Sequence, residues 1–217
     1  SLSVCSVATL FALSLAPRLL PAQFLENELK SVAVGDLATQ AKTNGDPQRG
    51  AIVFFQQQMA CSKCHVVGKG GENGLGPNLA TLGERSGADK VSDEALVEAL
   101  LSPSKTIRKG FESVTIALVY GPTVAAFVVE KTADKLVIRD VTRGGALRTI
   151  ATADVEAIKN NELSIMPAGQ VNQLNSRQQF LDLIRYLMEI RDGGAKRAAE
   201  LQPPQSLRDG QRVRRKS

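Results

Sequence analysis

The spacing of apolar residues changes twice along this chain. In the first half, and again near the C-terminus, apolar residues recur every three or four positions, which is typical of amphipathic helices. We expect helices at residues 24–43, 47–58, 93–101 and 177–190. Asp46 before Pro47 predicts the start of the second helix. Ser176 and Gln179 form a capping box at the start of the last one.

From residue 113 onward the apolar residues alternate with polar ones, which predicts strands. The alternation runs through residues 114–120 and 124–128, and two further short runs cover 135–140 and 146–152. Glycine and proline residues separate these runs and favour turns. The sequence therefore predicts about four short antiparallel strands. A helical turn is expected after them, at residues 154–159.

The composition is that of a globular protein, with 43% hydrophobic and 23% charged residues. The most informative counts are one histidine, His65, and three cysteines, Cys5, Cys61 and Cys64. A structural zinc site usually takes four Cys or His ligands. These counts argue against structural zinc, against catalytic sites that need two histidines, and against a disulfide framework.

The net charge of +5 is concentrated at the C-terminus. Residues 206–217 hold five basic residues and one acidic residue, which leaves only +1 on the rest of the chain. We expect residues 191–217 to form a flexible basic tail with a solvated charge run. No basic patch interleaved with aromatic residues occurs elsewhere, so nucleic acid is not an expected partner.

The chain begins with an apolar segment that carries no charge at residues 2–17. This segment is shorter than the roughly 20 residues of a membrane-spanning helix and suits the apolar region of a secretory signal. Residues 1–22, including Cys5, are predicted to be a signal-peptide-like leader. The protein is then exported, to the periplasm or another extracytoplasmic space, with no stable membrane insertion after removal of the leader. An uncleaved anchor or a buried helix is the alternative.

Cys61-Ser62-Lys63-Cys64-His65 has the spacing that attaches a c-type haem. Two residues between the cysteines let both sulfurs bond the former vinyl groups, and the histidine that follows lies under the iron. A thioredoxin-like Cys-x-x-Cys would start a helix within a βαβ unit, whereas this motif follows a helix and leads into a glycine-rich segment. The sequence therefore predicts one covalently attached haem c, with His65 as an iron ligand.

The second axial ligand must be a methionine, a lysine, a weak ligand or water, because the chain has no second histidine. Met59 lies two residues before Cys61 and is tied to the wrong side of the ring. Met188 lies beside the apolar stripe of the last helix, where core packing is expected. Met166 lies in a loop whose path is constrained by the neighbouring Pro167. We therefore predict Met166 as the ligand.

These motifs resemble those of a monohaem c-type cytochrome of class I with His/Met ligation. The matching pieces are a helix with Gly50 and Phe54, CSKCH, Gly76-Pro77-Asn78-Leu79, Met166-Pro167 and Tyr186-Leu187. The resemblance implies a mainly α cytochrome c fold, with helices around a covalently bound haem, over residues 46–190. Residues 23–45 would then be an N-terminal helical extension.

The resemblance also implies roles for individual residues. Gly50 would let the first and last helices approach closely, with Phe54 and Tyr186 filling in around it. Pro77 would offer its backbone carbonyl to the ring of His65, and Leu79 would pack on the haem face.

One departure from small cytochromes is the 101-residue separation between His65 and Met166. The strand-rich residues 111–159 account for about half of it and are interpreted as an inserted small antiparallel β subdomain. Three segments lie at or near the ends of this insertion: Leu101-Ser102-Pro103-Ser104, Lys109-Gly110-Phe111-Glu112-Ser113 and Ser164-Ile165-Met166-Pro167. With them, the arrangement is similar to a narrower bacterial family of haem-binding domains of cytochrome c type, which are often fused to other extracytoplasmic domains. That family implies no dedicated activity.

The expected function is single-electron transfer between redox partner proteins, without enzymatic activity. A haem-based sensor or peroxidase-like domain with an open or labile sixth position is the first alternative. The second is a redox or docking module of a larger dehydrogenase assembly, in which residues 111–159 contact a partner enzyme.

Overall fold

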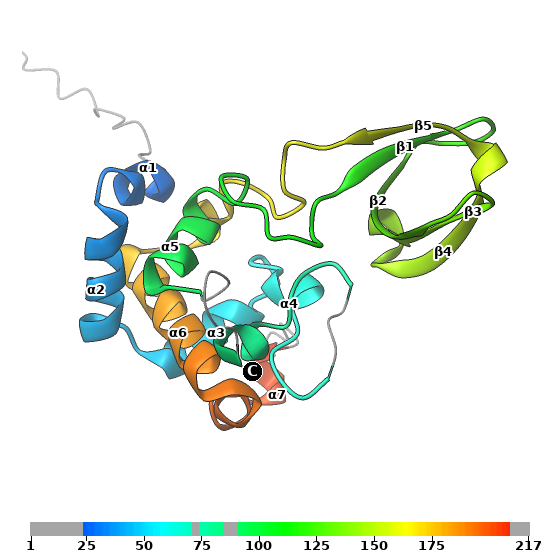
Figure 1. The fold of residues 1–217 in the computed structure, drawn as a ribbon. Helices are drawn as coiled ribbons and strands as arrows, with labels where there is room; N and C mark the ends of the chain where they lie inside the picture. Colours follow the sequence, from blue (N-terminus) through cyan, green and yellow to red (C-terminus); the bar gives the residue numbers. More distant parts are fainter. Residues whose placement is uncertain (1–23, 71–73, 85–90, 209–217) are drawn as a thin grey trace, which may run out of the picture.

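The structure is a computed structural model that describes residues 24–70, 74–84 and 91–208 (Figure 1). The predicted leader, with Cys5, and residues 209–217 of the predicted tail lie outside these ranges. Within them, no helix has both the length and the apolar character needed to cross a membrane.

The helices pack around one hydrophobic core, and α6 is in contact with α2, α3, α5 and η1. The largest fully buried side chains of this core include Phe54, Phe180 and Tyr186. The helices are α1 (Leu25–Lys30), α2 (Val34–Asn44), α3 (Pro47–Phe55), α4 (Cys61–Cys64), α5 (Asp93–Leu101), α6 (Arg177–Glu200) and α7 (Gln205–Arg208). Short 3-10 turns include η1 (Leu79–Glu84) and η5 (Gln170–Gln173).

The two predicted helix starts are confirmed. The carboxylate of Asp46 accepts hydrogen bonds from the backbone N–H groups of Gln48 and Arg49, which caps α3. The hydroxyl of Ser176 accepts one from the backbone N–H of Gln179, which caps α6. Both caps satisfy N–H groups that have no partner within the helix.

α3 and α6 cross in close contact at Gly50. A Cβ atom on Gly50 would lie 1.9 Å from the carbonyl oxygen of Asp182 and 2.7 Å from the Cβ of Tyr186. The rings of Phe54 and Tyr186 lie beside the crossing, with their centroids 5.5 Å apart. The close approach that was expected at Gly50 is therefore present, and only glycine fits there.

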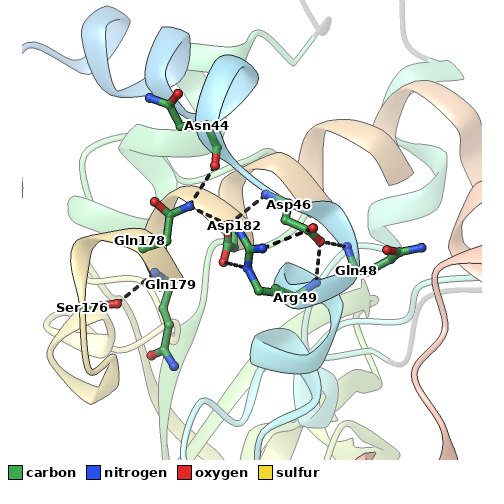
Figure 2. A network of polar contacts seen from close by, with 8 residues as sticks. All are labelled: Asn44, Asp46, Gln48, Arg49, Ser176, Gln178, Gln179 and Asp182. Atoms are coloured by element: carbon green, nitrogen blue, oxygen red, sulfur yellow. Dashed lines mark hydrogen bonds and ion pairs between the residues drawn. The ribbon is translucent and has the colours of Figure 1, made fainter.

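Asp182, on α6, fastens the start of α3 to α6 (Figure 2). Its carboxylate accepts hydrogen bonds from the backbone N–H of Asp46 at 2.8 Å and from the guanidinium of Arg49 at 2.7 and 2.9 Å. The side chain of Gln178 donates another at 2.8 Å. Burial acts to raise the pKa of Asp182, but these hydrogen bonds outweigh it and hold the pKa below its ordinary value.

Five strands form a single antiparallel sheet in the order β4-β3-β2-β1-β5. They are β1 (Val114–Leu118), β2 (Val124–Lys131), β3 (Lys135–Asp140), β4 (Ala146–Ala151) and β5 (Val155–Asn160). The sheet lies to one side of the helices (Figure 1). It has a hydrophobic cluster of its own, formed by Val114, Ile116, Val124, Ala126, Leu136, Ile138 and Ile150.

The prediction of a mainly α cytochrome c fold with a small β subdomain is wrong. The chain combines a helical part with a five-stranded antiparallel sheet, and each part has its own hydrophobic cluster. The sheet is larger than expected because residues 154–159, predicted as a helical turn, contribute β5. This strand pairs with β1, where Ile158 lies opposite Ile116 and Ala157 opposite Ala117.

The prediction of a flexible tail from residue 191 is also wrong for its first part. α6 continues to Glu200, with a kink where Gly194 adopts a φ of 61°. Beyond the kink, Ala198 and Leu201 are buried in the helical core. Gly194 therefore bends the helix rather than ending it, because apolar residues beyond it can still pack.

The crossing at Gly50 leads to a first prediction. We expect Gly50→Ala to lower the free energy of unfolding by about 3 kcal/mol, because the added methyl group overlaps backbone atoms of α6. The matched control is Gly35→Ala in α2, where a Cβ meets nothing within 4 Å. It should be neutral or add up to about 1 kcal/mol through helix propensity. Urea unfolding of both variants is the measurement, and equal stabilities would contradict the tight crossing.

The Asp182 network leads to a second prediction, on pH dependence. A carboxylate whose pKa is lowered in the folded state stabilises the fold above its unfolded pKa, and this contribution is lost as pH falls through the folded pKa. We therefore expect Asp182→Asn to cost about 2 kcal/mol at neutral pH. The difference from the parent chain should shrink below roughly pH 4.

Urea unfolding between neutral and acidic pH measures this effect. Asp134→Asn, at an exposed position between β2 and β3, is the matched control and should follow the parent chain throughout. A stability difference for Asp182→Asn that stays constant with pH would show that the carboxylate charge does not hold the helices together.

Candidate functional site

The two cysteines of CSKCH lie in the one-turn helix α4, directly after α3. Ala60, which precedes α4, has a φ of 53°, and this left-handed conformation turns the chain sharply between the two helices. Residues three apart on a helix share a face, so Cys61 and Cys64 lie on one side of α4. Both are free and half-buried.

His65 follows α4 in an extended conformation, and its ring is held by Pro77. The ring Nδ1 lies 3.0 Å from the carbonyl oxygen of Pro77. A carbonyl oxygen only accepts hydrogen bonds, so Nδ1 carries the proton in this contact. In the neutral ring, Nε2 then keeps the lone pair that a metal ion needs. The contact expected of Pro77 is therefore present.

The loop that carries Pro77 is closed by Asn78, which is 1% exposed. Its side-chain amide donates to the carbonyl oxygens of Gly68 and Gly70, and its side-chain oxygen accepts from the backbone N–H of Ala80. These bonds tie Gly68 and Gly70 to the segment that carries Pro77 and hold the Pro77 carbonyl in place. The sequence indicated Asn78 only as part of the motif Gly76-Pro77-Asn78-Leu79 and did not reveal this role.

Gly76 leaves room for the His65 ring. A Cβ atom on Gly76 would lie 2.7 Å from Cε1 and 2.8 Å from Nδ1 of His65. Any side chain at this position would push the imidazole away from Pro77. The structure therefore adds Gly76 to the residues that position His65, a role that the sequence did not reveal.

The loop with Met166 lies next to the segment that leads into α4. The side chain of Gln170, four residues after Met166, donates hydrogen bonds to the carbonyl oxygens of Met59 and Gln58 at 2.6 and 3.2 Å. Met59 is two residues before Cys61. Gln170 therefore joins the segments that carry the two predicted axial ligands, and sequence reasoning missed it.

Met166 is also the methionine whose side chain is most available. Met59 and Met188 are each 2% exposed, in the helical core, whereas Met166 is half-buried. Cys61 and Leu79 are likewise half-buried, and all three pack against the same core. These three predicted site residues therefore all border the helical core.

Burial is the main cause of the pKa shifts of the two cysteines and the histidine in CSKCH. It raises the pKa of Cys61 to about 11, with Cys64 adding to the rise. It also raises the pKa of Cys64, against an opposing effect of Lys63. A Cys-x-x-Cys redox motif instead lowers the pKa of one cysteine, so this pair is poorly suited to thiol–disulfide exchange. Burial lowers the pKa of His65, opposed by its hydrogen bond to Pro77.

The residues present fit a covalently attached haem. Two thiols on one face of a helical turn, a histidine with Nε2 available and a half-buried methionine form a suitable donor set. Of three buried polar atoms without a hydrogen-bond partner among the described residues, the Oδ1 of Asp93 is ion-paired with Arg191, which leaves the Nη1 of Arg108 and the hydroxyl of Tyr186. Burial raises the pKa of Tyr186, and Cys61 adds to the rise. A buried polar atom without a partner calls for an explanation, and a bound ligand is one such explanation.

Two further observations bear on bound groups. Among the described residues, no three or more His, Cys, Asp or Glu side chains cluster as a metal site would require; a haem iron needs no such cluster, because the porphyrin supplies four nitrogens. A cavity of about 550 Å³ lies between residues 67–69 and 195–202. None of the predicted site residues lines this cavity.

No protein-family model matches the chain, and no curated protein matches it significantly. The resemblance to c-type cytochromes therefore stays a prediction, based on the motifs alone.

The contact between Gly76 and His65 leads to a third prediction. Gly76→Ala should displace the imidazole and lower the free energy of unfolding by about 2 kcal/mol. Because His65 is the only histidine, its ring signals in a ¹H–¹³C NMR spectrum need no further assignment, and we expect them to shift. The matched control is Gly68→Ala in the same loop, where a Cβ meets nothing within 4 Å. Unchanged ring signals in Gly76→Ala would contradict the contact.

Proposed function

We propose that this protein is a single-electron carrier, a c-type cytochrome with one haem attached through Cys61 and Cys64. His65 and Met166 would be the axial ligands. The observation that carries the proposal is the arrangement around the only histidine: it directly follows two cysteines on one helical turn, and the Pro77 carbonyl fixes its ring with Nε2 left for a metal. When bound, the haem supplies an Fe(III)/Fe(II) couple.

The residues around His65 have a positioning role in this proposal. Pro77 fixes the tautomer and orientation of the imidazole, and its hydrogen bond makes Nε2 a stronger donor. Asn78 holds the loop that carries Pro77 in place, and Gly76 leaves room for the ring of His65. Leu79, half-buried against the core, would exclude water from the haem face and so limit the reorganisation that accompanies electron transfer.

Met166 would complete the iron coordination from a loop that is fastened at two points. Its backbone N–H donates to the hydroxyl of Ser164, and the backbone N–H of Ser164 donates to the hydroxyl of Ser104. On the other side, Gln170 is bonded to the Met59 carbonyl. A neutral thioether favours Fe(II), which raises the reduction potential relative to a second histidine. With six ligands the iron has no open position for a substrate, so the proposal includes no enzymatic activity.

The partners in this proposal are other redox proteins in an extracytoplasmic compartment. Attachment of haem c there agrees with the apolar leader expected at residues 1–22. Docking would be weak and brief, as is usual for redox encounters. The edge strand β5 exposes Glu156 and Lys159, and charges at a sheet edge oppose strand pairing with another protein. These charges therefore oppose docking by strand addition at β5.

A fourth prediction tests the axial ligand. The exported protein should keep its haem after denaturing extraction, because the bond is covalent, and should show a low-spin spectrum with the weak near-infrared sulfur-to-iron charge-transfer band. Met166→Ala should abolish this band and make the ferric haem high-spin. Met59→Leu and Met188→Leu are the matched controls and should keep the band, because both side chains are buried in the core.

Two outcomes would contradict the proposal. Haem that is lost on extraction would exclude attachment through Cys61 and Cys64. A native protein that is high-spin, and that binds carbon monoxide readily in the ferrous state, would exclude a six-coordinate carrier and favour a haem-based sensor.

A further inference from the structure

We propose that Arg108 is the anchor for a propionate group of the haem. The inference rests on the proposed function, because it assigns a binding partner within the same site. Arg108 belongs to none of the motifs that predicted the haem, and it lies in the segment between α5 and β1.

The first observation is an unpaired buried donor. The Nη1 atom of Arg108 is inaccessible to solvent and has no hydrogen-bond partner. A guanidinium stays charged at all relevant pH values, and burying part of it without an acceptor costs free energy. An acidic group that arrives with a ligand would remove this cost. A haem brings two carboxylates, and a guanidinium can bind a carboxylate through two parallel hydrogen bonds.

The second observation is that Arg108 is held in place. Its carbonyl oxygen accepts a hydrogen bond from the backbone N–H of Phe111 at 2.9 Å, which closes a turn. The guanidinium carbon lies 5.7 Å from the centre of the Phe111 ring, within the range of a cation–π contact. Phe111 in turn packs edge-on against Phe127 of β2, with ring centroids 5.9 Å apart. The sheet therefore supports the side chain that orients Arg108.

The third observation places this segment beside the methionine loop. Ser104, four residues before Arg108, accepts a hydrogen bond from the backbone N–H of Ser164 at 3.0 Å. Ser164 accepts one from the backbone N–H of Met166 at 3.1 Å. The segment that carries Ser104 and Arg108 is thus hydrogen-bonded to the loop of Met166, the predicted ligand.

Arg139, on β3, is a second arginine to consider among the described residues. Its Nη1 lies 3.0 Å from the position that a Cβ on Gly74 would take, so its side chain packs on the loop that follows His65. Unlike Arg108, it has no buried atom without a hydrogen-bond partner. The unpaired donor therefore favours Arg108, and Arg139 serves as a comparison in the test.

The experiment compares haem-loaded Arg108→Gln, Arg108→Lys, Lys109→Gln and Arg139→Gln by spectroelectrochemical titration and resonance Raman spectroscopy. Arg108→Gln should lower the midpoint potential, because an uncompensated propionate stabilises Fe(III), and should shift the propionate bending band. Arg108→Lys keeps the charge and should retain most of the potential. Lys109→Gln removes the same charge from the neighbouring exposed residue, where solvent screens it, and should leave both readouts near those of the parent.

Three results would overturn the inference while leaving the proposed function intact. These are equal shifts for Arg108→Gln and Lys109→Gln, an unchanged propionate band in Arg108→Gln, and a larger shift for Arg139→Gln than for Arg108→Gln. If Arg108→Gln does not fold, a shifted propionate band in Arg108→Lys supports the contact and an unshifted one overturns it. Failure of the proposed function is a different result, since it would appear as the absence of covalently attached haem in the parent protein.

Discussion

The close crossing of α3 and α6 fixes the geometry on which the candidate site depends. Gly50 lets the two backbones touch, and buried hydrogen bonds to Asp182 then hold the start of α3 against α6. α3 leads into α4, so its direction decides where the cysteines and His65 lie. α6 follows the loop of Met166, so its position decides where that loop ends. A change at the crossing would therefore move one half of the site relative to the other.

Local patterns in the sequence predicted much of the secondary structure, because caps and periodicity act over a few residues. Asp46 and Ser176 marked helix starts that the structure confirms. β5 was missed because Glu156, Ala157 and Lys159 favour a helix on their own. Their strand conformation comes from pairing with β1, more than 35 residues earlier. The end of the last helix was predicted too early for a related reason: burial of Ala198 depends on tertiary packing.

The candidate site, too, was predicted from the sequence only in part. The cysteines and His65 stand next to one another in the sequence, so their spacing alone indicated the chemistry. Asn78 and Gln170 act instead through backbone carbonyls that folding brings to them from other segments. No pattern of residue types marks such contacts, since any residue could supply the carbonyl. The polar side chains that organise the site were therefore visible only in the structure.

The residues at which the chain enters and leaves the β-sheet are in contact, and this contact limits the effect of the sheet on the rest of the fold. The backbone N–H of Asn161 donates to the carbonyl oxygen of Ser113 at 2.9 Å, and its side chain donates to the Ser113 hydroxyl at 3.0 Å. The chain thus leaves the helical part and returns to it at neighbouring positions, as it would through a short turn. Because loop-closure entropy grows with the length of flexible chain, a folded sheet makes it easier to bring Met166 back towards His65. Its interior can then tolerate changes in sequence and length, provided that Ser113 and Asn161 still meet and that Phe127 and Arg139 keep their contacts.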